Sequence, residues 1–426
     1  MSAYAPAGPA VIVDPYSSGA LYAPAFREAG VPSVALVTAP TPPDVYAASY
    51  RPEDFSEVIV ASDGLSTAIA RLRALRPRCV LAGCESGVEL ADLVAPQVVP
   101  EVANAPETAS ARRHKGDMAR AVAQAGLPII EQICTDDPDE VEAWIERSGL
   151  RGRDLVIKPP KSASTDGVTR VARGEGWHDV FTSMLGQRNR LGLLNDRLVV
   201  QEYCEGTEYV VDTASHAGVH SVSDICRYHK VDNGGHMAVY ESMSWMSPLF
   251  PAYADLVGYA FGVLDAVGMR FGAAHIELML TQRGPRLIEI GARPHGGGHP
   301  HFCRVATGES QLDRVVRRFV SDEPMPASYQ LRRHVRVLFL MARRAGRVRN
   351  ASVLDEVKNL PSHHFSRIAI RDGDRLAITK DLFGSLDLGF VVLAHPELAR
   401  VDADAQRMRE LEQQVVLVPE ASPRRS

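Results

Sequence analysis

Two glutamates stand inside apolar segments that are otherwise typical of buried strands. Glu277 lies in GAAHIELML and Glu289 in RLIEIGARP, and the TQRG between these segments is typical of a turn. A hairpin would bring both carboxylates to one sheet face, where they repel each other unless a cation lies between them. Magnesium prefers such hard oxygen ligands, whereas ion pairs with Arg286 or Arg293 would neutralise the same charges. The residue types leave both interpretations open.

A lysine and a loop of small residues form a second candidate site, in DLVIKPPKSASTDGV. Lys158 ends an apolar strand, and the loop after it could bring backbone N–H groups close to an anion, as glycine-rich phosphate loops do. The loop residues of interest are Ser162, Ser164, Thr165 and Gly167. Lys115 begins an amphipathic helix, where a lysine by itself is usually a solvated charge. Lys158 alone also fits a surface hairpin, so a phosphate site here depends on the other motifs.

Polar groups gather at a third place, the strand end in LVVQEYCEGTEYVVD. The open backbone of a hinge there could hydrogen-bond the edge of an adenine, and Glu208 could accept hydrogen bonds from ribose hydroxyls. Further along, RYHKVDNGGHMAVYE carries Lys230 and two adjacent glycines. We expect a mobile flap in this region, since long glycine-bearing loops between strands often serve as lids. An exposed acidic hairpin and a disordered surface loop are the plain alternatives.

The bulk composition is that of an ordinary globular protein of several domains. The chain has 426 residues, 45% of them hydrophobic, and a formal net charge of -5 without a long basic run. This charge balance argues against a nucleic-acid or anionic-membrane surface, where basic patches supply most of the affinity. The N-terminal segment does not resemble a signal peptide, and the six cysteines form no CxxC pair, so we expect a cytoplasmic protein with free thiols.

The elements expected around these motifs indicate α/β and α+β units. Residues 10–37 give strand, turn, helix and strand, which is a β-α-β unit, and the alternation continues to about residue 105. The loop over 83–87 is one place where a ligand would meet the strand ends of such a sheet. A helix is expected over about 110–125 and a linker over 322–328, followed by strands and a helix near 402–415.

The order of these motifs resembles the ATP-grasp ligase superfamily over residues of about 105 to 320. The resemblance rests on Lys115 with GLP after it, Lys158 with its small loop, QEYCEGTE, Glu277 and the run EIGAR. Each motif alone is unspecific, whereas their order and spacing together are characteristic. Within the superfamily, IVDPYSSGALYAPAFREAG, VVQEYCEGTEYVVDT and EIGARPHGGG are most similar to the L-amino acid ligases and dipeptide-forming enzymes of natural-product pathways.

The resemblance implies an ATP-grasp fold with an N-terminal Rossmann-like α/β domain, a central ATP-grasp lid and core, and a small C-terminal α+β domain. The implied ranges are 1–108 for the N-terminal domain, 109–199 for the lid, 200–325 for the core, 330–418 for the C-terminal domain and 419–426 for a disordered tail. The core would hold the magnesium and acyl-phosphate site.

The resemblance also implies roles for the residues above. The residues that would contact ATP are Lys115, Lys158, Ser162, Ser164, Thr165, Gly167, Gln201, Glu202, Tyr203, Cys204, Glu208 and Lys230. Lys115 at the helix start and Lys158 at the strand end would hold phosphates. The backbone of Glu202 and Cys204 would pair with adenine, with help from Gln201. Glu208 would accept hydrogen bonds from the ribose hydroxyls. Glu277 and Glu289 would bind Mg²⁺, with Mn²⁺ as the alternative ion.

The residues with implied catalytic roles are Arg293, His295, Gly296 and Gly297. Arg293 would steady the acyl phosphate and the oxyanion, to which the glycine N–H groups could also donate. His295 or His275 could deprotonate the incoming amine, or could merely hydrogen-bond within its loop. His295, His299 and His301 suggest zinc only weakly, because their surroundings give no established ligand spacing.

One position departs from the family pattern: many members have Asn two residues after the second glutamate, where this chain has Gly291. The implied activity is ADP-forming ligation of a carboxylate to an amine through an acyl phosphate, joining two amino acids or an acyl acid and an amino acid. The alternatives are a carboxylase-like or purine-pathway ligase, and a nucleotide-binding regulatory protein without catalysis. The expected partners are small molecules and a second copy of the chain in a homodimer. The sequence does not identify the acid or the amine.

Overall fold

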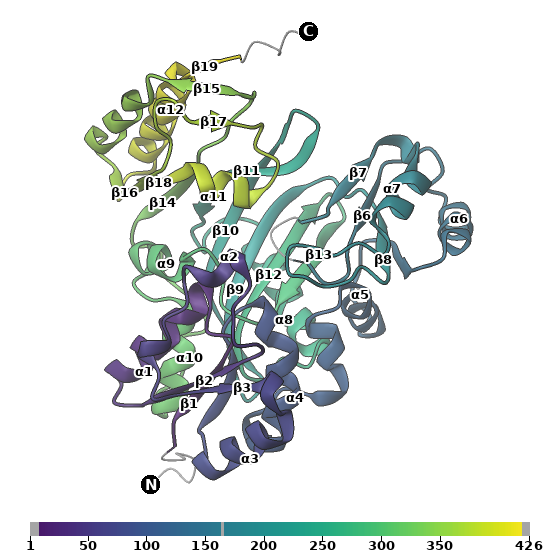
Figure 1. Cartoon of the computed structure of the whole chain (residues 1–426), viewed down its shortest axis with the longest axis vertical. Helices are drawn as coiled ribbons and strands as arrows, with labels where there is room; N and C mark the ends of the chain where they lie inside the picture. The colour runs from purple at the N-terminus through teal and green to yellow at the C-terminus, as the bar shows by residue number, and fades with distance from the viewer. Residues whose placement is uncertain (1–7, 163–165, 420–426) are drawn as a thin grey trace.

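The computed structural model describes residues 8–162 and 166–419 and arranges them around four β-sheets (Figure 1). The N-terminal unit lies at one end of the molecule and the C-terminal segment at the other, with long central strands between them and a smaller sheet to the side. Ser164 and Thr165, which the sequence places in the phosphate loop, lie outside the described residues. The domain limits expected from the sequence remain a prediction.

The N-terminal sheet is parallel, with strand order β3-β2-β1-β4. Its strands are β1 (Ala10–Val13), β2 (Ser33–Val37), β3 (Glu57–Val60) and β4 (Cys79–Ala82), and its longer helices are α1 (Tyr22–Glu28), α3 (Leu65–Leu75) and α4 (Val88–Val98). β1 and β2 are buried along their whole length, which explains why each is an uninterrupted apolar run. The predicted β-α-β unit is confirmed.

The side sheet is antiparallel, with strand order β5-β8-β6-β7. Its strands are β5 (Gln132–Thr135), β6 (Leu155–Lys158), β7 (Thr169–Val171) and β8 (Leu198–Glu202), and its helices are α6 (Pro138–Arg147) and α7 (Trp177–Met184). Trp144 of α6 and Phe181 of α7 are buried in the core that these helices form with the sheet. The acidic helix α6 therefore packs through its apolar face.

The helix expected over 110–125 is split in the structure. A 3-10 helix covers Pro106–Arg112, and α5 begins only at Lys115 and ends at Gln124 (Lys115–Gln124). The reason is local, because the Nδ1 atom of His114 accepts a hydrogen bond from the Asp117 N–H at 3.2 Å and so caps α5. Lys115 is thus the first residue of a helix, as the sequence predicts.

The central sheet has eight strands in the order β13-β12-β9-β10-β11-β14-β18-β16. Its strands are β9 (Thr207–His216), β10 (Val219–Asn233), β11 (His236–Trp245), β12 (Gly272–Thr281), β13 (Gly284–Gly291), β14 (His334–Phe339), β16 (His363–Ile368) and β18 (Gly389–His395). All neighbours in this sheet are antiparallel. The expected C-terminal domain therefore continues the sheet that carries Glu277 and Glu289.

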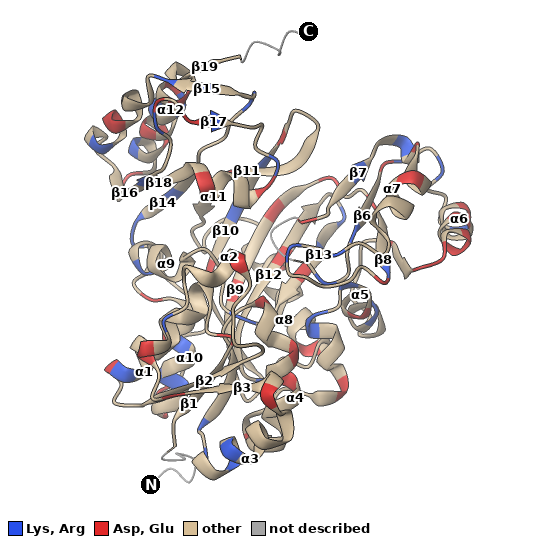
Figure 2. Ribbon diagram, viewed as in Figure 1, with Lys and Arg blue, Asp and Glu red and all other residues tan. Residues whose placement is uncertain are grey.

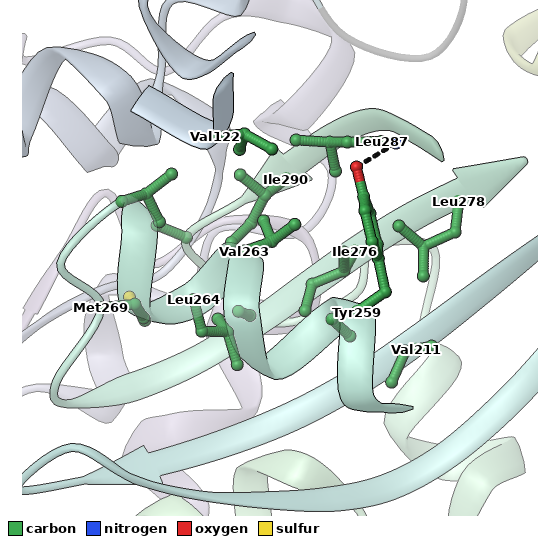
Figure 3. Packing of buried hydrophobic residues seen from close by; sticks show 14 of the residues in the cluster. Val122, Val211, Tyr259, Val263, Leu264, Met269, Ile276, Leu278, Leu287 and Ile290 are labelled. Atoms are coloured by element: carbon green, nitrogen blue, oxygen red, sulfur yellow. Dashed lines mark hydrogen bonds between the residues drawn. The ribbon is translucent and has the colours of Figure 1, made fainter. Parts of the chain in front are cut away.

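Helix α8 (Tyr253–Ala266) buries one face of this sheet (Figure 3). Val263 and Leu264 of α8 face Ile276 and Leu278 of β12, while the Tyr259 hydroxyl accepts a hydrogen bond from the Leu287 N–H at 3.1 Å. The apolar side chains along one face of α8 thus pack against the hairpin β12-β13 and hold it in place. The Tyr259 hydroxyl also satisfies a buried backbone N–H group of that hairpin.

The remaining elements surround the end of the central sheet. They are α9 (His299–Thr307), α10 (Gln311–Val320), α11 (Leu382–Leu388), α12 (Leu398–Gln414), β15 (Gly346–Arg349), β17 (Arg375–Leu376) and β19 (Val416–Val418). The helix predicted near 402–415 corresponds to α12, which packs against β14 and β18. Residues 322–328 have neither helix nor strand, in agreement with the expected linker.

Charged positions are interleaved over the ribbon, and acidic positions also occur on the central strands around β9 and β12 (Figure 2). Among the described residues, none of the helices combines the length and the apolar character needed to cross a membrane.

Candidate active site

The two strand-borne glutamates lie opposite each other. In the register of β12 and β13, Glu277 pairs with Glu289, and a β-bulge follows between Glu277 and Leu278. Directly opposed residues of an antiparallel pair project from the same face, so both carboxylates point to one side of the sheet. The hairpin expected from the sequence is therefore present, and its carboxylates form the acidic centre of the site.

Two lysines from the side sheet and α5 approach these carboxylates. The Lys115 Nζ atom lies 2.8 Å from Glu289 Oε2, and the Lys115 N–H donates to the Pro160 carbonyl at 3.0 Å, which ties α5 to the loop after β6. Lys158 is buried at the end of β6. Burial, together with the neighbouring Lys115, lowers the pKa of the Lys158 ammonium to about 8. A buried, weakly compensated cation of this kind suits a ligand with several negative charges.

Lys230 is placed differently from what the sequence suggested. The long loop expected over residues 227–241 is wrong, because these residues form the hairpin β10-β11 with only Gly234 and Gly235 in its turn, and movement of this hairpin as a flap stays a prediction. Lys230 Nζ lies 2.5 Å from Glu208 Oε1 and 3.9 Å from Glu277 Oε2, and 4.4 Å from the centre of the Tyr240 ring. Lys230 is thus part of the sheet and connects the expected ribose and metal ligands.

The two carboxylates that share Lys230 differ in their proton affinity. Burial raises the pKa of Glu208 to about 7, with Glu277 adding to the rise and Lys230 opposing it. Burial acts on Glu277 too, but Lys230 and His275 hold the pKa of Glu277 well below its usual range. Glu277 is therefore the carboxylate of this pair that stays charged at neutral pH, as a cation ligand requires.

Arg293 is held by a residue that the sequence did not single out. Its Nε atom lies 2.9 Å from Glu85 Oε2, and Glu85 Oε1 lies 3.1 Å from Arg113 Nη1. Despite burial, the two arginines lower the pKa of Glu85. Glu85 belongs to the strand-end loop over 83–87, where a ligand was expected. The only signals in the sequence were this loop and the arginine pair that precedes Lys115.

Arg113 has spare capacity for an anion. Its side chain is buried, and its Nη2 atom has no hydrogen-bond partner among the residues that the structure describes. Its Nη1 atom also donates to the Ser162 carbonyl at 3.4 Å, so the same arginine touches the start of the predicted phosphate loop. Ser162 is buried, and Gly167 has a φ of 72°, which favours glycine.

The glycine run is held in place by two serines from the N-terminal unit. The Gly297 N–H donates to Ser17 Oγ and the Gly298 N–H to Ser18 Oγ, both at 3.2 Å. Gly296 lies beside them, and a Cβ atom there would stand 3.5 Å from Ser17 Oγ. The N–H group of Gly297 that the sequence assigned to an oxyanion therefore already has a partner, which a substrate would have to replace.

A buried cluster of histidines and aspartates lies behind the acidic centre. Asp212 is fully buried, and its carboxylate lies 3.0 Å from His275 Nδ1, 2.7 Å from His295 Nδ1 and 3.1 Å from His299 Nε2. His299 Nε2 also lies 2.8 Å from Asp224 Oδ2. His275 Nε2 reaches Glu277 Oε1 at 3.2 Å, so Asp212 orients a side chain that contacts the acidic centre. Neither Asp212 nor Asp224 could be inferred as part of the site from the residues around it in the sequence.

This cluster bears on two interpretations that the sequence left open for the histidines. The His295 Nε2 atom lies 2.9 Å from the Tyr228 hydroxyl, so both of its ring nitrogens are engaged, and burial with His275 and His299 lowers its pKa well below the usual range. These contacts favour the alternative that His295 hydrogen-bonds within its loop. His301 is exposed while His295 and His299 are buried and stacked, so the three histidines do not converge on zinc.

Although burial opposes it, Asp224 and Asp212 raise the pKa of His299 to about 9. His299 is thus the charged partner of the aspartates.

The expected adenine segment is partly occupied by protein contacts. Gln201 is buried in β8, opposite Gln132 and Val156. The Glu202 N–H donates to the Glu131 carbonyl and the Tyr203 N–H to the Asp154 carbonyl, both at 2.9 Å. An adenine therefore cannot use these two N–H groups without displacing a protein acceptor. Cys204 follows them, half-buried.

The acidic centre opens into a cavity of about 910 Å³. Glu277, Glu289, Arg293 and the glycine run line one part of it, the loops of the N-terminal unit a second, and β14, β16, β18 and α11 a third. A site with hard carboxylate oxygens, buried cations and a large adjoining cavity can bind a divalent cation, a polyphosphate and further small molecules together.

Comparisons with known proteins agree with this geometry. A model of the ATP-grasp domain matches residues 152–300. The chain is 29% identical over 308 residues to dapdiamide A synthase of Enterobacter agglomerans, covering 72% of each protein. It is 25% identical over 220 residues to an L-arginine-specific L-amino acid ligase of Bacillus subtilis, covering 50% of this chain and 51% of the relative. The solved structure of an L-amino acid ligase from Bacillus licheniformis superposes with a TM-score of 0.72 at 17% identity, covering 97% of this chain and 99% of that one.

Proposed function

We propose that this chain, an ATP-grasp ligase, joins a carboxylate to the amine of an amino acid with conversion of ATP to ADP and phosphate. The superfamily and the fold class predicted from the sequence are confirmed by the comparisons. The proposal for the reaction rests on one observation: Glu277, Glu289 and Arg293 line one end of a cavity large enough for two further small molecules, where Lys115 contacts Glu289.

The residues present fit a nucleotide and its metal ion. Glu277 and Glu289 offer hard oxygen ligands on one sheet face, so Mg²⁺ or Mn²⁺ would be held there and would neutralise phosphate charge. Lys115, Lys158 and the loop from Ser162 would hold the phosphates, while Glu208 would accept from the ribose. The free Nη2 atom of Arg113 supports an anion site at the same place.

The chain's own residues would carry the two steps as follows. Arg293 orients the carboxylate, whose oxygen takes the terminal phosphoryl group of ATP, so that an acyl phosphate and ADP result. The amine nitrogen then bonds to the acyl carbon, the carbon–oxygen bond to phosphate breaks, and the departing phosphate takes the amine proton. Arg293 stabilises the negative charge that develops on the carbonyl oxygen, and the Gly297 N–H group adds to this once the oxygen replaces Ser17 as its acceptor.

The test is a screen of the proteinogenic L-amino acids in pairs, with ADP release and product mass as readouts. We expect ADP release that requires both an acid and an amine, and a product lighter by one water than the sum of the two. ADP release that depends on bicarbonate would instead support carboxylase-like chemistry. ATP binding without turnover in any mixture would support a regulatory protein.

A further inference from the structure

The cavity beside the acidic centre has two unlike walls. The wall from the N-terminal unit carries the polar side chains of Ser17, Tyr46, Ser49 and Glu85 beside smaller apolar ones. The wall from the C-terminal segment is dominated by phenylalanine and leucine side chains, with His364, Arg367 and Asp387 as its polar members. An apolar surface next to a charged catalytic centre is the usual form of a binding site for an apolar part of a ligand.

Three phenylalanine rings from three different elements form the centre of the apolar wall. Phe302 of α9 lies 6.4 Å from Phe365 of β16 and 6.0 Å from Phe390 of β18, and the last two rings lie 5.9 Å apart, all measured between ring centres. Phe365 is 45% exposed although it lines the cavity. The wall is therefore a packed aromatic surface with open area that faces the site.

Helix α11 extends this wall and is fixed in position. Leu382, Phe383 and Leu386 of α11 line the cavity. At the start of the helix, Asp381 forms an ion pair with Arg190 at 2.8 Å, and the Arg190 guanidinium lies 5.3 Å from the centre of the Phe383 ring. Arg190 lies in the segment between α7 and β8 of the side sheet, so α11 connects the C-terminal segment to the part of the molecule that carries Lys158.

A cation lies on the same wall. Arg367 lines the cavity, and it projects from the same face of β16 as Phe365 because the two are separated by one residue. In the register of β16 and β18, Arg367 pairs with Phe390. An apolar surface with a guanidinium at its edge matches an amino acid that has an apolar side chain and a free carboxylate.

The charged side chains on each wall indicate which of the two substrates, the activated acid or the amine, binds there. Arg293 lines the polar side, and the buried Arg113 contacts the same Glu85 carboxylate from behind, so two guanidinium groups share one carboxylate there and leave positive charge for the carboxylate that is to be activated. We propose that the apolar wall binds the other substrate, the amine-bearing amino acid, and selects a bulky aliphatic or aromatic side chain for it. Arg367 receives the carboxylate of that amino acid. This inference rests on the ligase function proposed above.

The first test varies the amine against each acid that supports turnover, and tandem mass spectrometry identifies which residue supplies the amine. We expect kcat/KM at least about a hundredfold higher with leucine, isoleucine or phenylalanine as the amine than with alanine or aspartate, since each buried methylene is worth about tenfold or more. Turnover without such a preference, or a preference that attaches to the acid instead, would overturn the proposal while leaving the ligase function intact.

The second test uses Phe365→Ala, which removes a partly exposed ring and so spares the fold. We expect kcat/KM for the leucine amine to fall about tenfold or more, with that for alanine changed less than about twofold. Leu249→Ala, at a leucine that is 90% exposed and is not among the residues lining the cavity, is the matched control and should leave both values unchanged. Equal losses for leucine and alanine in Phe365→Ala would contradict a selective wall.

Direct binding separates this inference from the activity. Calorimetric titration of the full chain with L-leucine and with L-alanine, in the presence of ADP and magnesium, should detect leucine at a lower concentration. Arg367→Ala should weaken leucine binding and leave L-leucinamide, which lacks the carboxylate, unaffected. If ADP is never released but leucine binds in this manner, the proposed ligase function is refuted while the proposed binding site for an apolar amino acid is supported. If leucine does not bind, the proposed binding site is refuted.

Discussion

Glu277 lies directly opposite Glu289 across the hairpin β12-β13, and the Lys115 ammonium lies 2.8 Å from Glu289. Two carboxylates on adjacent strands of one sheet face repel each other, and Lys115 and Lys230 contact one carboxylate each. Residues far apart in the chain thus converge on an arrangement that favours a divalent cation and the phosphates it accompanies.

Removing either carboxylate should stop turnover. We expect Glu277→Gln and Glu289→Gln to lower ADP release at least about a hundredfold, because each removes a charge that the transition state needs. Glu205→Gln, at an exposed glutamate just before β9, the strand that pairs with β12, is the matched control and should retain the rate of the unmodified protein. Near-normal ADP release by Glu289→Gln would contradict the assignment of the acidic centre.

Nucleotide binding should weaken above pH 8. The pKa of Lys158 is lowered to about 8, so this lysine loses its charge as the pH rises through that value and no longer attracts phosphate. We expect the affinity for ATP, measured by calorimetry, to fall by up to about tenfold per pH unit above this point. Lys158→Met should abolish this dependence, whereas Lys161→Met, at a lysine paired with Glu89, should keep it.

Lys158 should also make the free energy of unfolding depend on pH, but here the effect of rising pH is an increase, not the decrease expected for ATP affinity. Its pKa in the folded protein lies below the ordinary value near 10.5, so between pH 8 and that value the unfolded chain binds more protons. The contribution of Lys158 to the free energy of unfolding therefore rises with pH in this window. Urea denaturation of the unmodified protein and of Lys158→Met at several pH values measures it, and a contribution that falls with pH would contradict the buried position.

Gly291 should matter for the position of Arg293. A Cβ atom at residue 291 would stand 2.9 Å from the Cζ atom of Arg293, so any side chain there displaces the guanidinium from Glu85. We expect Gly291→Asn to lower kcat about tenfold or more while the melting temperature changes little, since a flexible side chain can move. Gly258→Ala, at an exposed helical glycine with open space around it, should leave kcat unchanged.

Asp212 should be a major contributor to stability. Its buried carboxylate contacts His275, His295 and His299, and loss of one member of such a buried charged set costs about 3–5 kcal/mol. We expect Asp212→Asn to lower the free energy of unfolding by that order in urea denaturation. Asp265→Asn removes an aspartate that is 74% exposed and also contacts a histidine, and it should cost about 1 kcal/mol or less. Equal effects would refute the role of burial.

Local patterns predicted much of the site. The apolar strands of Glu277 and Glu289, their intervening turn, Lys115 at the start of α5 and Lys158 at the end of β6 could all be inferred, because each depends on the residues immediately around it. The long loop expected over residues 227–241 was wrong for a local reason as well, since the Gly234-Gly235 pair that forms the turn is itself a signal for a two-residue hairpin.

The parts that could not be predicted depend on contacts between distant segments. Glu85 reaches Arg293 across 208 positions of the chain, and Asp212 reaches His295 across 83. The apolar wall likewise combines Phe302, Phe365 and Phe390, which are unremarkable in their own segments. Only the packing of the strands shows that these side chains share one cavity.

The central claim, that a carboxylate is activated by phosphoryl transfer, has one direct measurement. With an active pair of amino acids, the acid is labelled with heavy oxygen in its carboxyl group, and the released phosphate is analysed by mass spectrometry. The account predicts one heavy oxygen in the phosphate for each amide formed, together with ADP. Amide formation with unlabelled phosphate, or with AMP in place of ADP, would contradict it.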